Sequence, residues 1–346
     1  MKEVQSMVRE DIIKAYQLFK DDISKYIFEN RLLYSFTGDF KFIGNVVCTT
    51  DSGKKVYEIL NNASEPIAVF GAGKAGKRFI SSHQNIHFTC FIDSYKKNMD
   101  YDGLPIINLE QFKEKYENGI VVIPPTIYHE EMLKQLKEEG FDEKRIINEG
   151  AETEKLKHLQ YFDLPQLNEK RNAREIFVDG GGYDGTTSLD FLKWCSNWSQ
   201  GYVYVCEPDE KNQLKCKENL SANKIAYKLI SKGLWKDKER LRFNMSESCS
   251  FISTEGELEI EVDSIDHLIK EPVTFIKMDI EGSEYQAILG AENMITRHKP
   301  KLAISVYHKP EDIWQLPLLI YQFNPEYQLY LRHYSFGNNE TVLYAL

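Results

Sequence analysis

The feature that most constrains the fold of this chain is a pattern that occurs twice: an apolar strand, a glycine-rich turn and an amphipathic helix. The first copy reads "PIAVFGAGKAGKRFISSH" from residue 66, and the second reads "IFVDGGGYDGTTSLDFLKW" from residue 176. Each copy is followed by further apolar strands that alternate with helical segments, such as "FTCFID" and "YVYVCEP". Strands that alternate with helices predict parallel sheets with right-handed crossovers. We therefore expect an α/β protein with two doubly wound domains.

The domain boundaries are predicted from changes in this pattern. Residues 1–60 form an N-terminal helical segment, because apolar side chains between residues 8 and 29 recur at helical spacing. Residues 61–150 hold a Rossmann-like accessory domain, and residues 151–173 are polar enough for a linker helix. The second sheet occupies residues 174–346 and ends in "YQLYLRHY" and "TVLYAL", which are predicted to form an antiparallel pair. The stretches "LRFNMSESCSFIS" and "ELEIEVDSI" are also predicted to pair.

The composition limits the classes of partner. The 43 Lys and Arg residues and 53 Asp and Glu residues give a net charge of -10 at pH 7. This balance provides no overall field that would attract nucleic acid or an anionic membrane. No segment approaches the roughly 20 apolar residues of a transmembrane helix or the apolar run of a signal peptide. The six cysteines include no C-x-x-C pair, so we expect a cytoplasmic protein with reduced thiols, and a homo-oligomer is compatible with these data.

The first glycine loop, "FGAGKAGKR", fits two nucleotide-binding patterns. The dinucleotide pattern G-x-G-x-x-G is formed by Gly71, Gly73 and Gly76. Asp93 ends the following strand, where that pattern expects an acid that binds ribose. Lys77 completes most of a triphosphate-binding loop, but Arg78 stands where that loop requires Ser or Thr. No tyrosine–lysine catalytic pair is apparent near the loop, so we interpret the domain as a recognition or docking module ahead of a redox one.

The second glycine loop, "FVDGGGYDGTTS", carries an acid and no lysine. Asp179 ends the strand, and glycines after it let the backbone approach a ligand closely; they are Gly180, Gly181, Gly182 and Gly185. An acid without a lysine favours a ligand with an ammonium or sulfonium group. Glu207, followed by Pro208, ends the next strand, where a carboxylate can bind a ribose diol. NAD would satisfy this loop and acid equally well, so the pair alone leaves the cofactor open.

A third stretch, "FIKMDIEGSEYQAILGA", supplies candidate catalytic groups. Asp279 ends a buried strand at the edge where open parallel sheets bind ligands. Glu281 and Glu284 follow at a helix start, where acids also stabilise the helix dipole, and we predict that they lie on the substrate side. His308 ends the next strand and can titrate near neutrality. Asp279 and His308 are thus the candidate general bases. Asp279 with Glu281 could also bind magnesium, but no Asp–Asn ligand pair lies beside them, so we expect a metal-independent enzyme.

Together with "VYVCEPD", "EVDSIDHL" and "PKLAISVYH", these stretches occur in the order typical of a known family. Residues 174–346 resemble the FkbM family of S-adenosylmethionine-dependent methyltransferases, and "KMDIEGSE" is the most specific part of the resemblance. The resemblance implies a seven-stranded methyltransferase sheet whose last strand is antiparallel, with S-adenosyl-L-methionine as cofactor. Gly182 stands where the family commonly has alanine, and Tyr183 and Asp184 stand where Asn and an apolar residue are common.

The resemblance also implies a role for individual residues. It assigns the methionine end of the cofactor to the second glycine loop, principally Asp179, Gly181 and Gly185. It assigns the ribose to Glu207. The adenine would be approached by the segment after the third strand, which contains Lys232 and Gly233.

Methyl transfer to a hydroxyl is the activity that this resemblance implies. We expect a small-molecule or glycan acceptor, specifically a sugar hydroxyl in a glycan, glycolipid or secondary metabolite. Residues 66–148 resemble N-terminal Rossmann-like modules of nucleotide-sugar and polysaccharide enzymes, which favours a sugar acceptor. Two alternatives remain: an NAD(P)-dependent oxidoreductase that uses the Gly71–Gly76 loop, and a sugar-nucleotide-binding module with an inactive methyltransferase fold.

Overall fold

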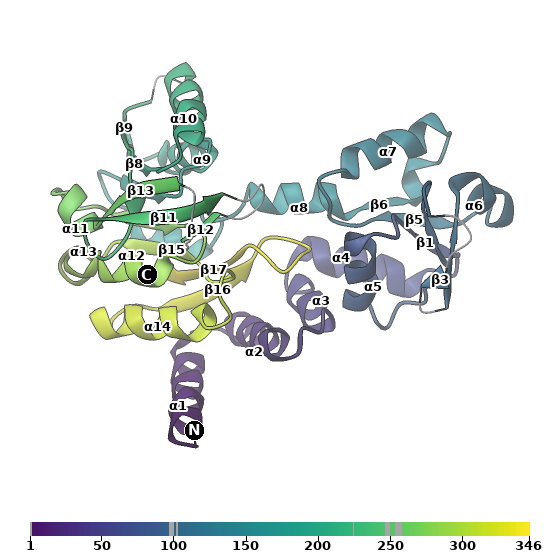
Figure 1. Cartoon of the computed structure of the whole chain (residues 1–346), viewed down its shortest axis with the longest axis horizontal. Helices are drawn as coiled ribbons and strands as arrows, with labels where there is room; N and C mark the ends of the chain where they lie inside the picture. The colour runs from purple at the N-terminus through teal and green to yellow at the C-terminus, as the bar shows by residue number, and fades with distance from the viewer. Residues whose placement is uncertain (1, 97–99, 102, 224, 246–249, 253–257) are drawn as a thin grey trace. The chain divides into compact units, whose positions relative to one another are not determined.

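The chain folds into two compact units (Figure 1). The computed structural model describes residues 2–96, 100–101, 103–223, 225–245, 250–252 and 258–346. Unit 1 comprises Met1–Lys25, Gln160–Arg332 and Thr341–Leu346, and unit 2 comprises Tyr26–Leu159 and His333–Glu340. Each unit is built on a mainly parallel sheet with helices, which confirms the predicted class of two α/β domains.

The main sheet of unit 1 has seven strands in the order β16-β17-β15-β14-β7-β8-β9. They are β7 (Ile176–Gly180), β8 (Tyr202–Cys206), β9 (Tyr227–Ile230), β14 (Phe275–Met278), β15 (Lys301–Ser305), β16 (Leu329–His333) and β17 (Thr341–Ala345). The pairs from β15 through β14, β7 and β8 to β9 are parallel, whereas β17 runs antiparallel to β15. This topology confirms the expected seven-stranded sheet with an antiparallel last strand.

A smaller sheet of unit 1 has the order β10-β13-β11-β12. Its strands are β10 (Gly233–Leu234), β11 (Glu239–Met245), β12 (Ser250–Ile252) and β13 (Leu258–Asp263). β11 pairs antiparallel with both β12 and β13, which confirms the predicted pairing of these segments. Cys249 lies outside the described residues.

The helices of unit 1 surround an aromatic core. They are α1 (Lys2–Leu18), α9 (Thr186–Cys195), α10 (Glu210–Ala222), α11 (Ile265–Leu268), α12 (Glu284–Leu289), α13 (Glu292–His298), α14 (Asp312–Phe323) and the 3₁₀ helix η2 (Pro165–Lys170). In the core, the ring of Phe177 from β7 stacks on that of Phe191 from α9 at 4.5 Å, and Phe275 from β14 meets Phe177 edge-on. These contacts fix α9 on the sheet, and so fix the glycine loop that joins β7 to α9.

The sheet of unit 2 has the order β3-β4-β2-β1-β5-β6. Its strands are β1 (Ile67–Phe70), β2 (Cys90–Ile92), β3 (Asp100–Tyr101), β4 (Leu104–Ile107), β5 (Ile120–Ile123) and β6 (Ile146–Asn148). All described pairs are parallel except β3 with β4. The helices are α2 (Asp22–Thr37), α3 (Lys41–Val47), α4 (Asp51–Asn62), α5 (Lys74–Ser82), α6 (Leu109–Lys115), α7 (His129–Glu138), α8 (Glu149–Lys157) and the 3₁₀ helix η1 (Glu143–Arg145).

The units differ from the predicted domain boundaries at both ends of the chain. Residues 1–25 belong with unit 1, because α1 packs on α14 and Phe19 forms a bridge with Leu329. Residues 333–340 belong with unit 2, where Arg31 donates a hydrogen bond to the carbonyl of Asn338. Both differences arise from contacts between residues far apart in sequence.

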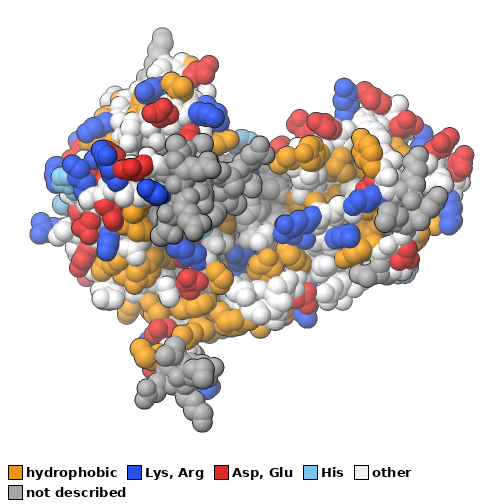
Figure 2. Space-filling model, viewed as in Figure 1, with side chains coloured by type: hydrophobic (Ala, Val, Ile, Leu, Met, Phe, Trp, Pro, Cys, Tyr) orange, Lys and Arg blue, Asp and Glu red, His pale blue; other side chains and the backbone are white. Residues whose placement is uncertain are grey.

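The described surface carries charges of both signs. Figure 2 shows acidic and basic side chains interspersed over the visible face. Among the helices that the structure describes, none is both long and apolar enough to cross a membrane. The five cysteines within the described ranges are free thiols.

Candidate active site

The candidate site lies where β7 and β14 end side by side. These strands are parallel neighbours, and their register pairs Asp179 with Lys277. The chain leaves β7 through the second glycine loop and leaves β14 through Asp279. The two segments remain in contact beyond the strands, because the amide of Asp279 donates to the carbonyl of Gly180 at 3.1 Å. Two of the motifs predicted to be functional therefore meet at one edge of the sheet.

Gly181 marks the closest approach of the two segments. Its φ is +75°, and a Cβ at this position would lie 2.0 Å from the carbonyl oxygen of Asp279. A side chain would therefore collide with backbone as well as strain the left-handed conformation. The glycine is required so that the loop can pass directly beside Asp279.

Asp179 is fully buried, and its carboxylate is already paired within the protein. Its Oδ1 accepts from Nζ of Lys277 at 3.0 Å, and its Oδ2 accepts from the hydroxyl of Ser188 at 2.7 Å. Lys277 also donates to the carbonyls of Gly180 and Gly181. Burial alone would lower the pKa of Lys277, but the nearby carboxylates, first that of Asp179, raise it above its usual value. The Asp179–Lys277 ion pair therefore holds the backbone of the glycine loop in place.

Lys277 was missed by the sequence analysis, which treated this loop as having an acid and no lysine. The lysine comes instead from the neighbouring strand. "FIKMDI" contained a signal for it, since one lysine interrupts a buried apolar strand. A buried lysine needs a carboxylate partner, and Asp179 is its register neighbour. The cation that Asp179 meets in this structure is therefore a protein group.

Glu207, which follows β8, connects that strand to the second glycine loop by hydrogen bonds. Its Oε2 accepts from the amide of Tyr183, and its Oε1 accepts from the amide of Asp209, both at 2.9 Å. Burial raises the pKa of Glu207. Each carboxylate oxygen has a further lone pair, so these bonds leave acceptor capacity for a ligand hydroxyl.

The segment predicted to approach adenine is also held by an ion pair. Nζ of Lys232 lies 2.9 Å from Oδ2 of the buried Asp263, whose Oδ1 lies 2.9 Å from Nδ1 of His267. Burial would raise the pKa of Asp263, but its bonds to Lys232 and His267 lower it. A Cβ on Gly233 would lie 3.8 Å from Pro208, so the start of β10 lies close to the segment that follows β8. The predicted adenine contacts of Lys232 and Gly233 stay predictions.

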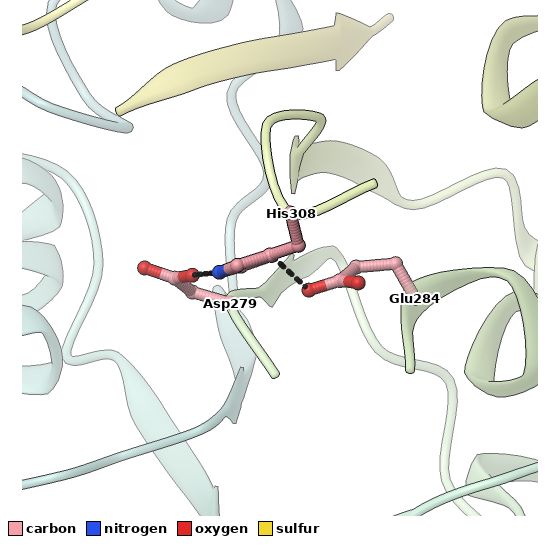
Figure 3. Close-up of side chains that lie close together, drawn as sticks. All are labelled: Asp279, Glu284 and His308. Carbon is pink, nitrogen blue, oxygen red and sulfur yellow. Dashed lines mark ion pairs between the residues drawn. The ribbon is translucent and has the colours of Figure 1, made fainter. Parts of the chain in front are cut away.

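His308 lies between two carboxylates, and each ring nitrogen faces one of them (Figure 3). Its Nδ1 is 3.0 Å from Oε1 of Glu284, which is fully buried at the start of α12. Its Nε2 is 3.4 Å from Oδ1 of Asp279. Burial would lower the pKa of His308, but the acids around it, first Glu284, raise it to about 9. The imidazole is therefore positively charged at neutral pH.

Two tyrosines hold the carboxylate of Asp279. The hydroxyl of Tyr161 donates to Oδ2 at 3.0 Å, and that of Tyr307 donates to Oδ1 at 3.1 Å. Burial would raise the pKa of Asp279, but Lys277 and His308, followed by the two hydroxyls, lower it. Neither tyrosine was among the predicted site residues. Tyr307 adjoins His308 and could have been considered, whereas Tyr161 comes from the predicted linker and gave no signal.

Two further acids complete the surroundings of His308. Oε2 of Glu281, a residue with φ of +55°, lies 3.6 Å from Nε2. Asp312 is buried at the start of α14, and burial raises its pKa to about 7. Of the two glutamates predicted on the substrate side, Glu281 is partly exposed, whereas Glu284 is buried and faces Nδ1.

The same cluster has the donor set of a metal site. One ligand atom from each of Asp279, Glu284 and His308 lies within 4.8 Å of the others. The imidazole stands between the two carboxylates, with one ring nitrogen near each. Metal independence is not tested by this geometry and stays our prediction.

In unit 2, Asp93 holds the backbone of the first glycine loop and of the segment after β2 by hydrogen bonds. One carboxylate oxygen accepts from the amide of Ala72, and the other accepts from the amides of Tyr95 and Lys96. Burial would raise the pKa of Asp93, but these bonds lower it. Gly71 has φ of +94°, and a Cβ on Gly76 would lie 2.0 Å from the carbonyl of Gly71. Both glycines are thus explained by the turn itself.

Comparison with protein families identifies the domain to which this site belongs. Residues 179–336 match the model described as Methyltransferase FkbM domain. This part of the chain is a methyltransferase FkbM domain, as the resemblance predicted. Residues 63–147 match a second model, described as C2185-like, N-terminal. A comparison with curated proteins found no match.

One solved structure supports the fold. Methyltransferase FkbM from Methylobacillus flagellatus KT is similar with a TM-score of 0.50 and 20% identity, over 91% of this chain and 100% of that chain. At this identity, the likeness shows the fold alone. Precorrin-6y C5,15-methyltransferase from Geobacter metallireducens GS-15 is 11% identical over 52% of this chain and 84% of that chain, with a TM-score of only 0.32.

Proposed function

We propose that this protein is an S-adenosylmethionine-dependent O-methyltransferase that acts on a sugar hydroxyl of a glycan, glycolipid or secondary metabolite. The observation that carries the proposal is the contact of Gly181 with Asp279 within an FkbM domain. Through this contact the loop predicted to bind the methyl donor adjoins Asp279, one of the two predicted bases. The sugar acceptor is supported by the resemblance of residues 66–148 to modules of nucleotide-sugar enzymes. The family match favours methyl transfer over the oxidoreductase alternative.

The residues at the sheet edge fit S-adenosylmethionine. Glycine backbone at Gly181 and Gly185, both with positive φ, gives a ligand close access to the loop. Glu207 retains acceptor capacity for ribose hydroxyls. Asp179 and Lys277 would act indirectly, by holding the loop carbonyls. When bound, S-adenosylmethionine supplies an electrophilic methyl group on a sulfonium.

The remaining task of the chain is to align an acceptor hydroxyl and remove its proton. We assign the proton to Nε2 of His308. Glu284 faces Nδ1 and orients the ring, as the buried acid orients the histidine in hydrolytic triads. Asp279 beside Nε2 accepts a hydrogen bond from the acceptor. Because the pKa of His308 is about 9, the neutral imidazole that can accept the proton is a minority species at pH 7.

The proposal is tested with the full chain, methyl-labelled S-adenosylmethionine and a panel of free, nucleotide-linked and lipid-linked sugars, with and without a chelator. We expect label transfer to one class of sugar, with no loss in the chelator arm. The variant His308→Ala is expected to lose about 10²–10⁴-fold in rate. His298→Ala, an exposed histidine on α13, is the matched control and should retain full activity.

Two results would overturn the proposal. One is a failure of S-adenosylhomocysteine to raise the melting temperature of the folded protein, since a ligand of the native state must stabilise it. The other is methyl transfer to a nitrogen or to an acceptor without hydroxyls. An untargeted search for methylated products in cells with and without the protein would identify the acceptor.

A further inference from the structure

The first glycine loop opens onto a pocket in unit 2. Its volume is about 390 Å³, which falls within the roughly 300–1,000 Å³ typical of small-molecule sites. The residues that line it come from the loop, from α5, from the segment after β2 and from β3: Ala72, Gly73, Lys74, Lys77, Arg78, Ser81, Lys96 and Tyr101. The pocket is separate from the candidate active site, which unit 1 contains.

The lining of this pocket is strongly basic. Among its described residues, four are Lys or Arg and none is Asp or Glu. Three of the basic residues lie on α5, whose first turn holds no acid and whose N-terminus has no side-chain cap. Positive side chains near a helix N-terminus oppose the helix dipole, so this arrangement costs stability unless an anion binds there.

The basic groups are held in place from two sides of the pocket. Nζ of Lys77 lies 3.8 Å from the ring centre of Tyr101, and Nζ of Lys96 donates to the carbonyl of Ala72 at 3.2 Å. An ammonium has three donors, so the bond from Lys96 leaves two for a ligand. These contacts preorganise cations from separate segments around one space, independently of the helix N-terminus.

Gly73 gives a further indication that the space is used. Its φ of -84° suits any residue, and a Cβ there would meet nothing within 4 Å. Packing therefore explains Gly71 and Gly76 but leaves Gly73 unexplained. Gly73 lines the pocket, and the lack of a side chain there leaves that part of the space free. The oxygens of Asp93 already bind three backbone amides, and Asp93 is not among the residues that line the pocket.

We propose that this pocket binds the diphosphate group of a nucleotide-sized ester. Two or three negative charges would match the converging cations, and the α5 amides would serve as further donors. The volume leaves space for part of an attached nucleoside or sugar. This site does not depend on the methyltransferase assignment.

Isothermal titration calorimetry on the full chain tests the proposal, with S-adenosylhomocysteine present in excess so that no probe reports on the candidate active site. The probes are inorganic pyrophosphate, UDP, UDP-glucose and NAD. We expect saturable binding of at least one diphosphate ester, weaker in 500 mM salt than in 50 mM salt because the attraction is screened. Preference among the last three probes distinguishes a nucleotide, a nucleotide sugar and a dinucleotide.

Variants locate the site. Gly73→Val adds a side chain to the pocket lining, and Lys74→Gln/Lys77→Gln removes two of its charges. Each variant is expected to weaken binding at least about tenfold. Lys134→Gln, an exposed lysine on α7, is the matched control and should bind like the unchanged protein. The proposal is wrong if no probe binds saturably, or if both variants keep their melting temperature and bind with unchanged affinity.

Discussion

At the scale of single residues, His308 illustrates how neighbours determine what a titratable side chain can do. Its position after β15 made it a candidate base, but sequence could not give its charge. That charge depends on Asp279, Glu281 and Glu284, which face the ring, and on Asp312, which lies close to Glu284. The same acids that make the imidazole basic also keep it protonated at neutral pH.

The pH dependence of methyl transfer follows from this charge. If neutral His308 accepts the proton, kcat/KM should rise about tenfold per pH unit from pH 7 and level off above about 9, because the base is released as the imidazolium loses its proton. Initial rates with labelled methyl donor between pH 6 and 10 measure this profile. A rate that is flat from pH 6 to pH 8 would exclude His308 as the base.

Glu284 should control the position of this profile. Replacing it by Gln removes the negative charge next to Nδ1, so the pKa of His308 falls and the plateau is reached at lower pH. A purely structural role would change the rate without moving the profile. Glu292→Gln, at an exposed acid of α13, is the control and should leave the profile in place.

Lys277 should be essential for folding as well as for loop position. The variant Lys277→Met leaves Asp179 charged and buried, and removing one partner of a buried pair costs about 3–5 kcal/mol. Urea unfolding measures the loss. The double variant Lys277→Met/Asp179→Asn removes both charges and should recover part of it. A loss below about 1 kcal/mol in the single variant would contradict the assigned role.

At the scale of elements, the local pattern predicted which segments are strands and helices and which ends carry functional groups. Asp279 and His308 were both predicted at strand ends, and the structure brings them together because the strands they follow are parallel neighbours. The seven-stranded sheet with an antiparallel last strand was expected from the family resemblance. The strand order was not predicted, since it depends on contacts that no local pattern contains. The role of Lys277 could be recognised only once β14 was known to neighbour β7. The role of Tyr161 could not be predicted, because its hydrogen bond to Asp279 joins residues 118 positions apart.

The connection between β7 and α9 makes a prediction at this scale. Gly181→Ala should destabilise the protein and abolish the stabilisation by S-adenosylhomocysteine, because its Cβ would displace the turn that carries Asp279. Gly140→Ala is the matched control: Gly140 also has positive φ, but its Cβ would meet nothing within 4 Å. The control should therefore show only the conformational cost of roughly 1–2 kcal/mol and keep the ligand-induced shift. Equal effects in both variants would mean that the contact with Asp279 is unimportant.

At the scale of the whole molecule, the sequence predicted two sheets but not which terminal segments join which unit. The amphipathic pattern of residues 8–29 indicated a helix whose apolar side must be covered. The structure pairs it with the methyltransferase unit through several contacts. Arg332 pairs with Asp21 at 2.7 Å, and the amide of Leu331 donates to the hydroxyl of Ser24 at 2.8 Å. The start of the chain thus supports β16, an edge strand of the main sheet.

This assignment can be tested because all four tryptophans lie in unit 1, so tryptophan fluorescence follows that unit alone. They are Trp194, Trp198, Trp235 and Trp314. Phe19 is buried against this unit, and Phe19→Ala should lower its stability by about 3–5 kcal/mol, the usual cost of a large core truncation. The midpoint of fluorescence-monitored urea unfolding should fall accordingly.

The matched variant is Phe79→Ala, which truncates a buried phenylalanine of α5 in unit 2. The stability lost in Phe79→Ala should lower the midpoint of the transition followed by far-ultraviolet circular dichroism, because that signal includes both units. The midpoint followed by fluorescence should stay near its original value. The opposite pattern would assign the first helix to the accessory unit. If both variants lowered both midpoints equally, the two units would unfold as one cooperative block, and the division of the chain into separately stabilised sheets would be wrong.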